Sequence, residues 1–152
     1  MSVFKNYEDW VALEGKELGV TEYLTITQEQ INAFADATLD HQWIHTDVER
    51  AKKESPFGAT IAHGYLTVSL IPCLVFSLFE LENNSMVINY AINDLKFSQP
   101  VVVNSKVRLR ADVAVVKNLR GTVKVTYNIV LEIESNQKPA YKGSVTILYK
   151  YG

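Results

Sequence analysis

Two side chains and one glycine carry the groups in this sequence that could do chemistry together. Asp40 and His45 lie five positions apart, and Gly64 stands at the start of a long apolar stretch. A carboxylate and an imidazole that face a shared water form a general acid/base pair, and each such group typically contributes about 10²–10⁴-fold in rate. Unpaired N–H groups at the start of a helix can receive a developing oxyanion. These parts would suffice to add water to an activated double bond.

The spacing of Asp40 and His45 requires a loop if the two side chains are to meet. On an unbroken helix, residues five apart lie about 140° apart around the axis, so the side chains would diverge. On a loop anchored by Trp43 and Ile44, both could point into one cavity. A solvated loop with a capping Asp is the alternative that the spacing leaves open. Gly64 is equally open: it could serve only a tight turn into its helix, or it could let a ligand approach the backbone closely.

Polar neighbours of these residues are candidates for the wall of the cavity. Gln42 and Tyr65 could donate hydrogen bonds to a ligand, and a polar residue at the rim is the equal alternative. His63 is expected to order its loop by hydrogen bonding rather than to transfer protons. His41 should point away from the cavity if His45 points into it. The three His and the single Cys follow no metal-ligand spacing, so no metal site is predicted.

Helix signals stand on both sides of the Asp–His loop. Thr27 begins a capping-box pattern, and apolar residues at helical spacing predict a helix that runs to about Thr38. Asp47 is the expected N-cap of a second short helix, residues 48–54. The loop from 40 to 45 is therefore expected between two helices.

A long apolar stretch runs from Gly64 to Leu81. It is apolar on nearly every face, which predicts a helix that is buried all round. Pro72 should kink this helix, because proline cannot donate a backbone hydrogen bond. Cys73 is expected to be a buried structural thiol. The stretch is too short and too interrupted for a membrane span, which needs about 20 apolar residues.

Strand signals surround this helix and predict the fold. One β-rich segment precedes the helices and four follow them: residues 18–26, 86–97, 105–116, 122–134 and 140–149. Turn signals between the last four favour an antiparallel meander, and alternating polarity indicates one covered face. One buried helix and one long antiparallel sheet pack most economically when the sheet wraps around the helix. The prediction is an α+β hotdog fold, as a single domain over residues 1–152.

Composition and charge narrow the class of protein further. The 152 residues are 47% apolar and 21% charged, which is typical of a globular protein. The net charge is −2 and the 15 Lys and Arg residues are dispersed, so nucleic acid is not an expected partner. The first residues lack the pattern of a secretory signal, and a cytoplasmic protein is expected.

The run from Phe34 to Asp47 resembles the signature of the MaoC-like dehydratases, the (R)-specific enoyl-CoA hydratases. Residues 56–58, 61–64 and 88–101 continue the resemblance, which covers most of the chain. Many members of this family have Gly where this chain has Leu39, and Asn-Pro where it has Gln42-Trp43. The Gln-Trp form is most similar to the branch that includes nodulation-protein-N-like sequences.

The resemblance implies a hotdog fold, a homodimer and a reaction. The reaction is the reversible hydration of a trans-2-enoyl-CoA thioester to its (R)-3-hydroxyacyl form. Asp40 and His45 match the catalytic pair of the family, and Gly64 matches the amide that holds the thioester carbonyl. No separate cofactor is implied, because coenzyme A is part of the substrate. An acyl-CoA thioesterase of the hotdog class and a non-catalytic acyl-thioester binding module are the alternatives, since fold alone does not establish function.

Overall fold

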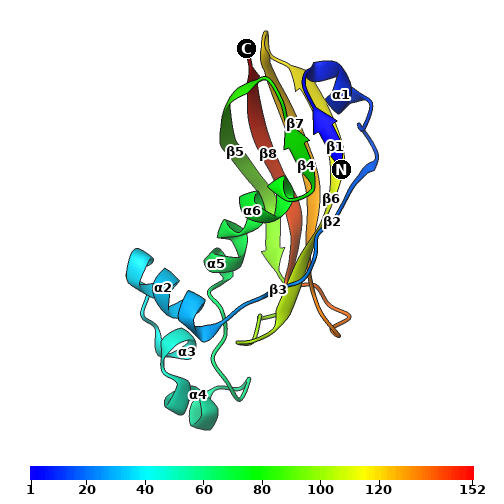
Figure 1. Ribbon diagram of the computed structural model, residues 1–152. Helices are drawn as coiled ribbons and strands as arrows, with labels where there is room; N and C mark the ends of the chain where they lie inside the picture. The colour runs from blue at the N-terminus through cyan, green and yellow to red at the C-terminus, as the bar shows by residue number, and fades with distance from the viewer.

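The computed structural model describes residues 1–152 and consists of one curved antiparallel sheet, a broken helix packed against it, and three short helices at one end (Figure 1). The strands are β1 (Ser2–Phe4), β2 (Glu17–Val20), β3 (Leu24–Thr25), β4 (Phe79–Leu81), β5 (Asn84–Phe97), β6 (Lys106–Asn118), β7 (Thr122–Ile133) and β8 (Tyr141–Tyr151). The helices are α1 (Tyr7–Val11), α2 (Gln28–Thr38), α3 (Trp43–Thr46), α4 (Val48–Glu54), α5 (Gly64–Ser69) and α6 (Ile71–Phe76). This arrangement confirms the predicted α+β hotdog fold.

The main sheet has the order β2-β6-β7-β8-β5, with β3 beside β6. The predicted meander is confirmed for β6, β7 and β8, which pair with their sequence neighbours. It is wrong for β5, which pairs with β8 and lies at the edge of the sheet. The reason is the connection over residues 98–105, which crosses the width of the sheet instead of closing a hairpin.

Inward-facing residues of the sheet form the core. From Val107 to Val113 of β6 and along all of β7 every second residue is buried, as the alternating sequence predicts. Val107, Leu109 and Leu131 have no exposed surface. Trp10 of α1 stacks on Phe4 at a centroid distance of 3.8 Å. Helix α1 lies at the end of the sheet farthest from α2–α4 (Figure 1).

The helix predicted over residues 64–81 is shorter than expected and is broken. It divides at Leu70 into α5 and α6, with Pro72 in the first turn of α6, where a missing N–H is tolerated. Residues Phe79–Leu81 form β4, which pairs in parallel with β1.

The central helices are also not buried all round. Tyr65, Ser69 and Cys73 recur every fourth residue and are exposed, because the sheet covers only the opposite face. The prediction of a buried Cys73 is therefore wrong. No helix in the structure is both long and apolar enough to cross a membrane.

The predicted caps place α2 and α4, which flank residues 40–45. The predicted loop is confirmed for residues 40–42 and is wrong for residues 43–45, which lie in α3. The Thr27 hydroxyl accepts a hydrogen bond from the Gln30 N–H at 3.2 Å, and α2 ends at Thr38 as predicted. The Asp47 carboxylate accepts from the Arg50 N–H at 3.0 Å at the start of α4. Together α2, α3 and α4 form a group beyond the end of the sheet, next to α5 (Figure 1).

Candidate active site

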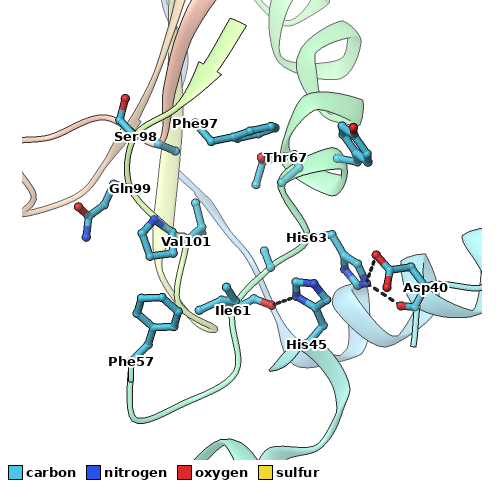
Figure 2. Close-up of a pocket in the computed structure, with 15 residues that line it drawn as sticks. Asp40, His45, Phe57, Ile61, His63, Thr67, Phe97, Ser98, Gln99 and Val101 are labelled. Atoms are coloured by element: carbon cyan, nitrogen blue, oxygen red, sulfur yellow. Dashed lines mark hydrogen bonds and ion pairs between the residues drawn. The ribbon is translucent and has the colours of Figure 1, made fainter. Parts of the chain in front are cut away.

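The fold brings Asp40, His45 and His63 together from three separate segments. Asp40 follows α2, His45 lies on the single turn of α3, and His63 immediately precedes α5. A carboxylate oxygen of Asp40 and one ring nitrogen of each histidine all lie within 4.8 Å of one another (Figure 2). One water that hydrogen-bonds two groups spans about 4.5 Å between them, so Asp40 and His45 are spaced to share a water.

The turn that directs Asp40 into this cluster is made by an unusual residue. Leu39 caps α2 in the left-handed region at φ 63° and is 81% exposed. Glycine adopts this conformation without strain, whereas in leucine the Cβ atom crowds the backbone and makes the conformation unfavourable. The structure thus explains physically why glycine suits the position before the acid, and it shows that Leu39 makes the same turn.

The orientation of the His45 ring identifies which nitrogen is free. Nδ1 lies 2.7 Å from the Ile61 carbonyl oxygen, and a carbonyl only accepts, so Nδ1 carries the hydrogen. Nε2 therefore presents a lone pair. The backbone around His45 is held as well, since Gln28 donates to the His45 carbonyl at 2.8 Å and accepts from the buried Thr60 hydroxyl. Gln28 and Thr60 were missed by the sequence reasoning, because nothing in their spacing connects them to α3.

Burial lowers the pKa of His45 below the usual value for imidazole. The hydrogen bond to the Ile61 carbonyl opposes this shift, repulsion from His63 adds to it, and attraction to Asp40 opposes it. The balance favours a neutral ring with a free Nε2 near neutral pH. Such a ring can take a proton from water.

Asp40 is the solvent-facing member of the cluster. Its side chain is about half exposed, with one carboxylate oxygen 4.0 Å from His63 Nε2. The Gln42 N–H lies 3.4 Å from the other oxygen. The carboxylate is therefore free to accept hydrogen bonds from a water or a ligand in the pocket.

Gly64 presents free amides at the start of α5. The N–H groups of Gly64 and Tyr65 have no acceptor within the chain, whereas the next two amides bond the His63 carbonyl. A Cβ at Gly64 would lie 2.8 Å from the Phe97 ring, and the φ of Gly64 is not positive. The structure therefore shows that this glycine is required by the packing of Phe97 and not by a positive φ, and the approach of a ligand to its backbone stays a prediction.

These groups line one pocket of about 460 Å³. Asp40, His45, His63, Gly64 and Tyr65 form one side of it. The opposite wall comes from the end of β5 and the segments around it, and Figure 2 shows it across from the two histidines. The wall residues include Phe57, Phe97, Gln99, Val101 and Ala140. The residue types of this wall did not indicate a pocket, and only the resemblance at residues 56–58 and 88–101 included any of its residues.

The structure corrects one candidate and places another. Gln42 does not line the pocket; it caps α3 with its backbone, and its side chain is exposed, so its proposed place in the pocket is wrong. Tyr65 does line the pocket, although it is 74% exposed. His41 lies on the surface, 3.8 Å from Asp36, and points away from the cluster as predicted.

The Asp40–His45–His63 cluster also contains the residue types that bind metals, which the sequence spacing did not indicate. Two of its four ring nitrogens already contact backbone carbonyl oxygens, those of Ile61 and Asp40. The absence of a metal stays a prediction.

A family model described as the MaoC like domain matches residues 10–134. The chain belongs to the MaoC-like dehydratase family. The 3-hydroxyacyl-thioester dehydratase Z of Mycobacterium tuberculosis is 41% identical over 150 residues, which is 98% of this chain and 99% of the relative. Nodulation protein N of Rhizobium meliloti is 43% identical over 134 residues, 87% of this chain and 83% of the relative.

Solved structures agree on the fold of this MaoC-like dehydratase. The R-hydratase PhaJ1 of Pseudomonas aeruginosa, in its unliganded form, superposes with a TM-score of 0.72 at 19% identity. The match covers 94% of this chain and 86% of that structure. As a MaoC-like dehydratase, the chain is an enzyme of the hydro-lyase class.

Proposed function

We propose that this MaoC-like dehydratase catalyses the reversible hydration of trans-2-enoyl-CoA thioesters to (R)-3-hydroxyacyl-CoA. The observation that carries the proposal is that an Asp40 carboxylate oxygen and a His45 ring nitrogen lie within 4.8 Å of each other, in the same pocket as Gly64, whose amide is unpaired. The name of the Mycobacterium tuberculosis relative, a 3-hydroxyacyl-thioester dehydratase, supports an acyl thioester as the substrate.

In the proposed mechanism, the pocket activates water and stabilises the oxygen that becomes negative. Asp40 accepts a hydrogen bond from one O–H of the water, and that hydrogen stays on the oxygen. His45 Nε2 takes the other proton as the water oxygen forms a bond to C3. The electron pair of the double bond moves toward the thioester carbonyl, whose oxygen accepts hydrogen bonds from the Gly64 and Tyr65 amides. C2 then takes a proton from the Asp40–His45 pair, which restores the enzyme. Removal of one such amide donor costs about 10²–10³ in turnover in other enzymes.

The direct test is to add purified protein to crotonyl-CoA and follow the loss of enoyl-thioester absorbance, with chiral analysis of the product. Formation of the (R)-3-hydroxyacyl product is expected. Asp40→Asn and His45→Gln should each abolish turnover and leave thermal unfolding near that of the wild type. Asp36→Asn and His41→Gln are matched controls, because these exposed residues lie in the same segment and pair with each other outside the pocket.

Three outcomes would decide against the proposal. Release of free thiol from saturated acyl-CoA would identify a thioesterase. Binding without turnover, insensitive to changes at Asp40 and His45, would identify a binding module. A rate confined to enoyl groups linked to an acyl carrier protein would correct the coenzyme A assignment and leave the reaction type unchanged.

We also propose that the enzyme is a homodimer formed through β5. This strand is the open edge of the sheet, and it exposes Met86, Ile88, Tyr90 and Ile92. A groove of about 680 Å³ is lined by residues of β5, β8, α5 and α6. A long edge strand with exposed apolar side chains is usually buried in an interface, and a second copy of the chain would bury it. Light scattering should give twice the mass of the chain, and Ile88→Lys should lower it; a monomeric wild type would refute the dimer.

A further inference from the structure

His63 contacts both members of the proposed catalytic pair without being open to solvent. It is 2% exposed, and it precedes α5 as its N-cap residue. Its ring stacks on the His45 ring with centroids 3.9 Å apart and planes inclined by 23°. Its Nε2 lies 2.9 Å from the Asp40 carbonyl oxygen, and Figure 2 shows His63 between Asp40 and His45. One side chain thus contacts both residues of the pair.

The second ring nitrogen of His63 has no partner. Because the Asp40 carbonyl only accepts, Nε2 carries the hydrogen, and in a neutral ring Nδ1 is a bare acceptor. Nδ1 is buried and makes no hydrogen bond within the chain. A buried unpaired polar atom is unfavourable for folding, and an apolar ring would fill the same space without that cost. The residue is therefore poorly explained by stability alone.

We propose that His63 is a positioning residue for the hydration: its Nε2–H holds the Asp40 backbone and its ring fixes the plane of His45, so that carboxylate and imidazole keep the spacing that holds one water. This inference rests on the proposed function. His63 does not itself exchange a proton with the substrate. Its stacking also holds His45 in the orientation in which Nδ1 bonds the Ile61 carbonyl and Nε2 is free.

The same contact predicts an effect on the pH profile. The charged or titratable groups that face His45 are the Asp40 carboxylate and the His63 ring. Repulsion from His63 is one of the causes that lower the pKa of His45, after burial. Removal of the His63 imidazole, with the site kept buried, should raise the pKa of His45. Because the proposed base must be neutral, the acidic limb of kcat/KM should move to higher pH.

Two substitutions separate the contacts of His63. His63→Phe keeps a stacked ring and loses the donor to Asp40, whereas His63→Gln keeps a donor and loses the ring. Misplacement by about 1 Å can cost about 10²-fold in rate, so kcat should fall by about 10²-fold in the Phe variant with KM nearly unchanged. The Gln variant, which keeps a donor to Asp40, should show a smaller fall in kcat than the Phe variant. The Phe variant should unfold near the wild-type temperature, because removal of the unpaired Nδ1 offsets loss of the hydrogen bond to the Asp40 carbonyl.

The decisive measurement does not depend on turnover. Nitrogen-15 NMR of the three imidazoles, assigned with single His variants, reports the tautomer and titration of His45 without substrate. In wild type His45 should be the Nδ1–H tautomer, and in both His63 variants its titration should move to higher pH. Unchanged His45 signals together with unchanged kcat in His63→Phe would overturn the inference. Wild-type protein that hydrates no enoyl thioester would instead refute the proposed function.

Discussion

Replacement of Gly64 with alanine tests the proposed thioester site most directly. The new Cβ would lie 2.8 Å from the Phe97 ring, about 0.6 Å short of the 3.4 Å at which ordinary contact begins. Overpacking of this kind typically costs about 1–3 kcal/mol. Phe97 is 51% exposed and can swing toward solvent, so about 1 kcal/mol is expected, or a fall of about 2–4 °C in Tm.

The effect on catalysis should exceed the effect on stability. Gly64→Ala keeps the N–H but displaces the wall against which the thioester would lie, so kcat/KM should fall by about 10–10²-fold, below the range for complete loss of an oxyanion donor. The assay is hydration of crotonyl-CoA, with Tm measured on the same samples. If the alanine variant retained wild-type kcat/KM, the placement of the thioester against the wall at Gly64 would be refuted.

A double-mutant cycle identifies the cause of the loss. Phe97→Leu removes the ring that the alanine would contact, so Gly64→Ala should cost less than about threefold in kcat/KM when both changes are combined. Phe97→Leu alone is the reference for this comparison. An equal cost of the alanine in both backgrounds would show that contact with Phe97 is not the reason.

Three further predictions concern the loop, the base and the metal. Leu39→Gly should raise stability by about 0.5–1 kcal/mol, because relief of the left-handed strain exceeds the added chain entropy; thermal unfolding measures this, and a lower Tm would contradict it. In the pH profile of wild-type kcat/KM, the midpoint of the acidic limb should lie below about pH 6.5, because the pKa of His45 is lowered and the base must be neutral. A midpoint at higher pH would contradict the assignment of His45 as the base. Dialysis against EDTA should leave the rate unchanged, because one nitrogen of each histidine in the Asp40 cluster contacts a backbone carbonyl; a rate restored only by added metal would contradict this.

Local features were predictable because they depend on residues only a few positions apart. The caps at Thr27 and Asp47 are hydrogen bonds to amides three residues later, so residue types and spacing suffice to place them. Strand alternation has a period of two, which is also local. The ends of β6, β7 and β8 were therefore predicted to within about two residues.

Errors in the sequence reasoning share a cause. An apolar stretch indicates that a segment will be buried, but it does not indicate which element packs against it or which of its faces is buried. The central helix was thus predicted to be buried all round, although the sheet covers one face and leaves Cys73 exposed. Strand β5 was placed in the meander, although long-range pairing puts it beside β8. Gln42 was placed in the pocket because its neighbours are there, although it is exposed and does not line the pocket.

The sequence by itself determined which chemical groups are available and which local turns carry them: an acid and an imidazole between two capped helices, and a glycine where the next helix begins. Only the tertiary structure decided how these groups meet. The Ile61 carbonyl selects the free nitrogen of His45, His63 contacts both members of the pair, and the Phe97 ring requires Gly64. These contacts join residues 16 to 33 positions apart, and packing of the helices against the sheet sets them, which no pattern of neighbouring residues specifies.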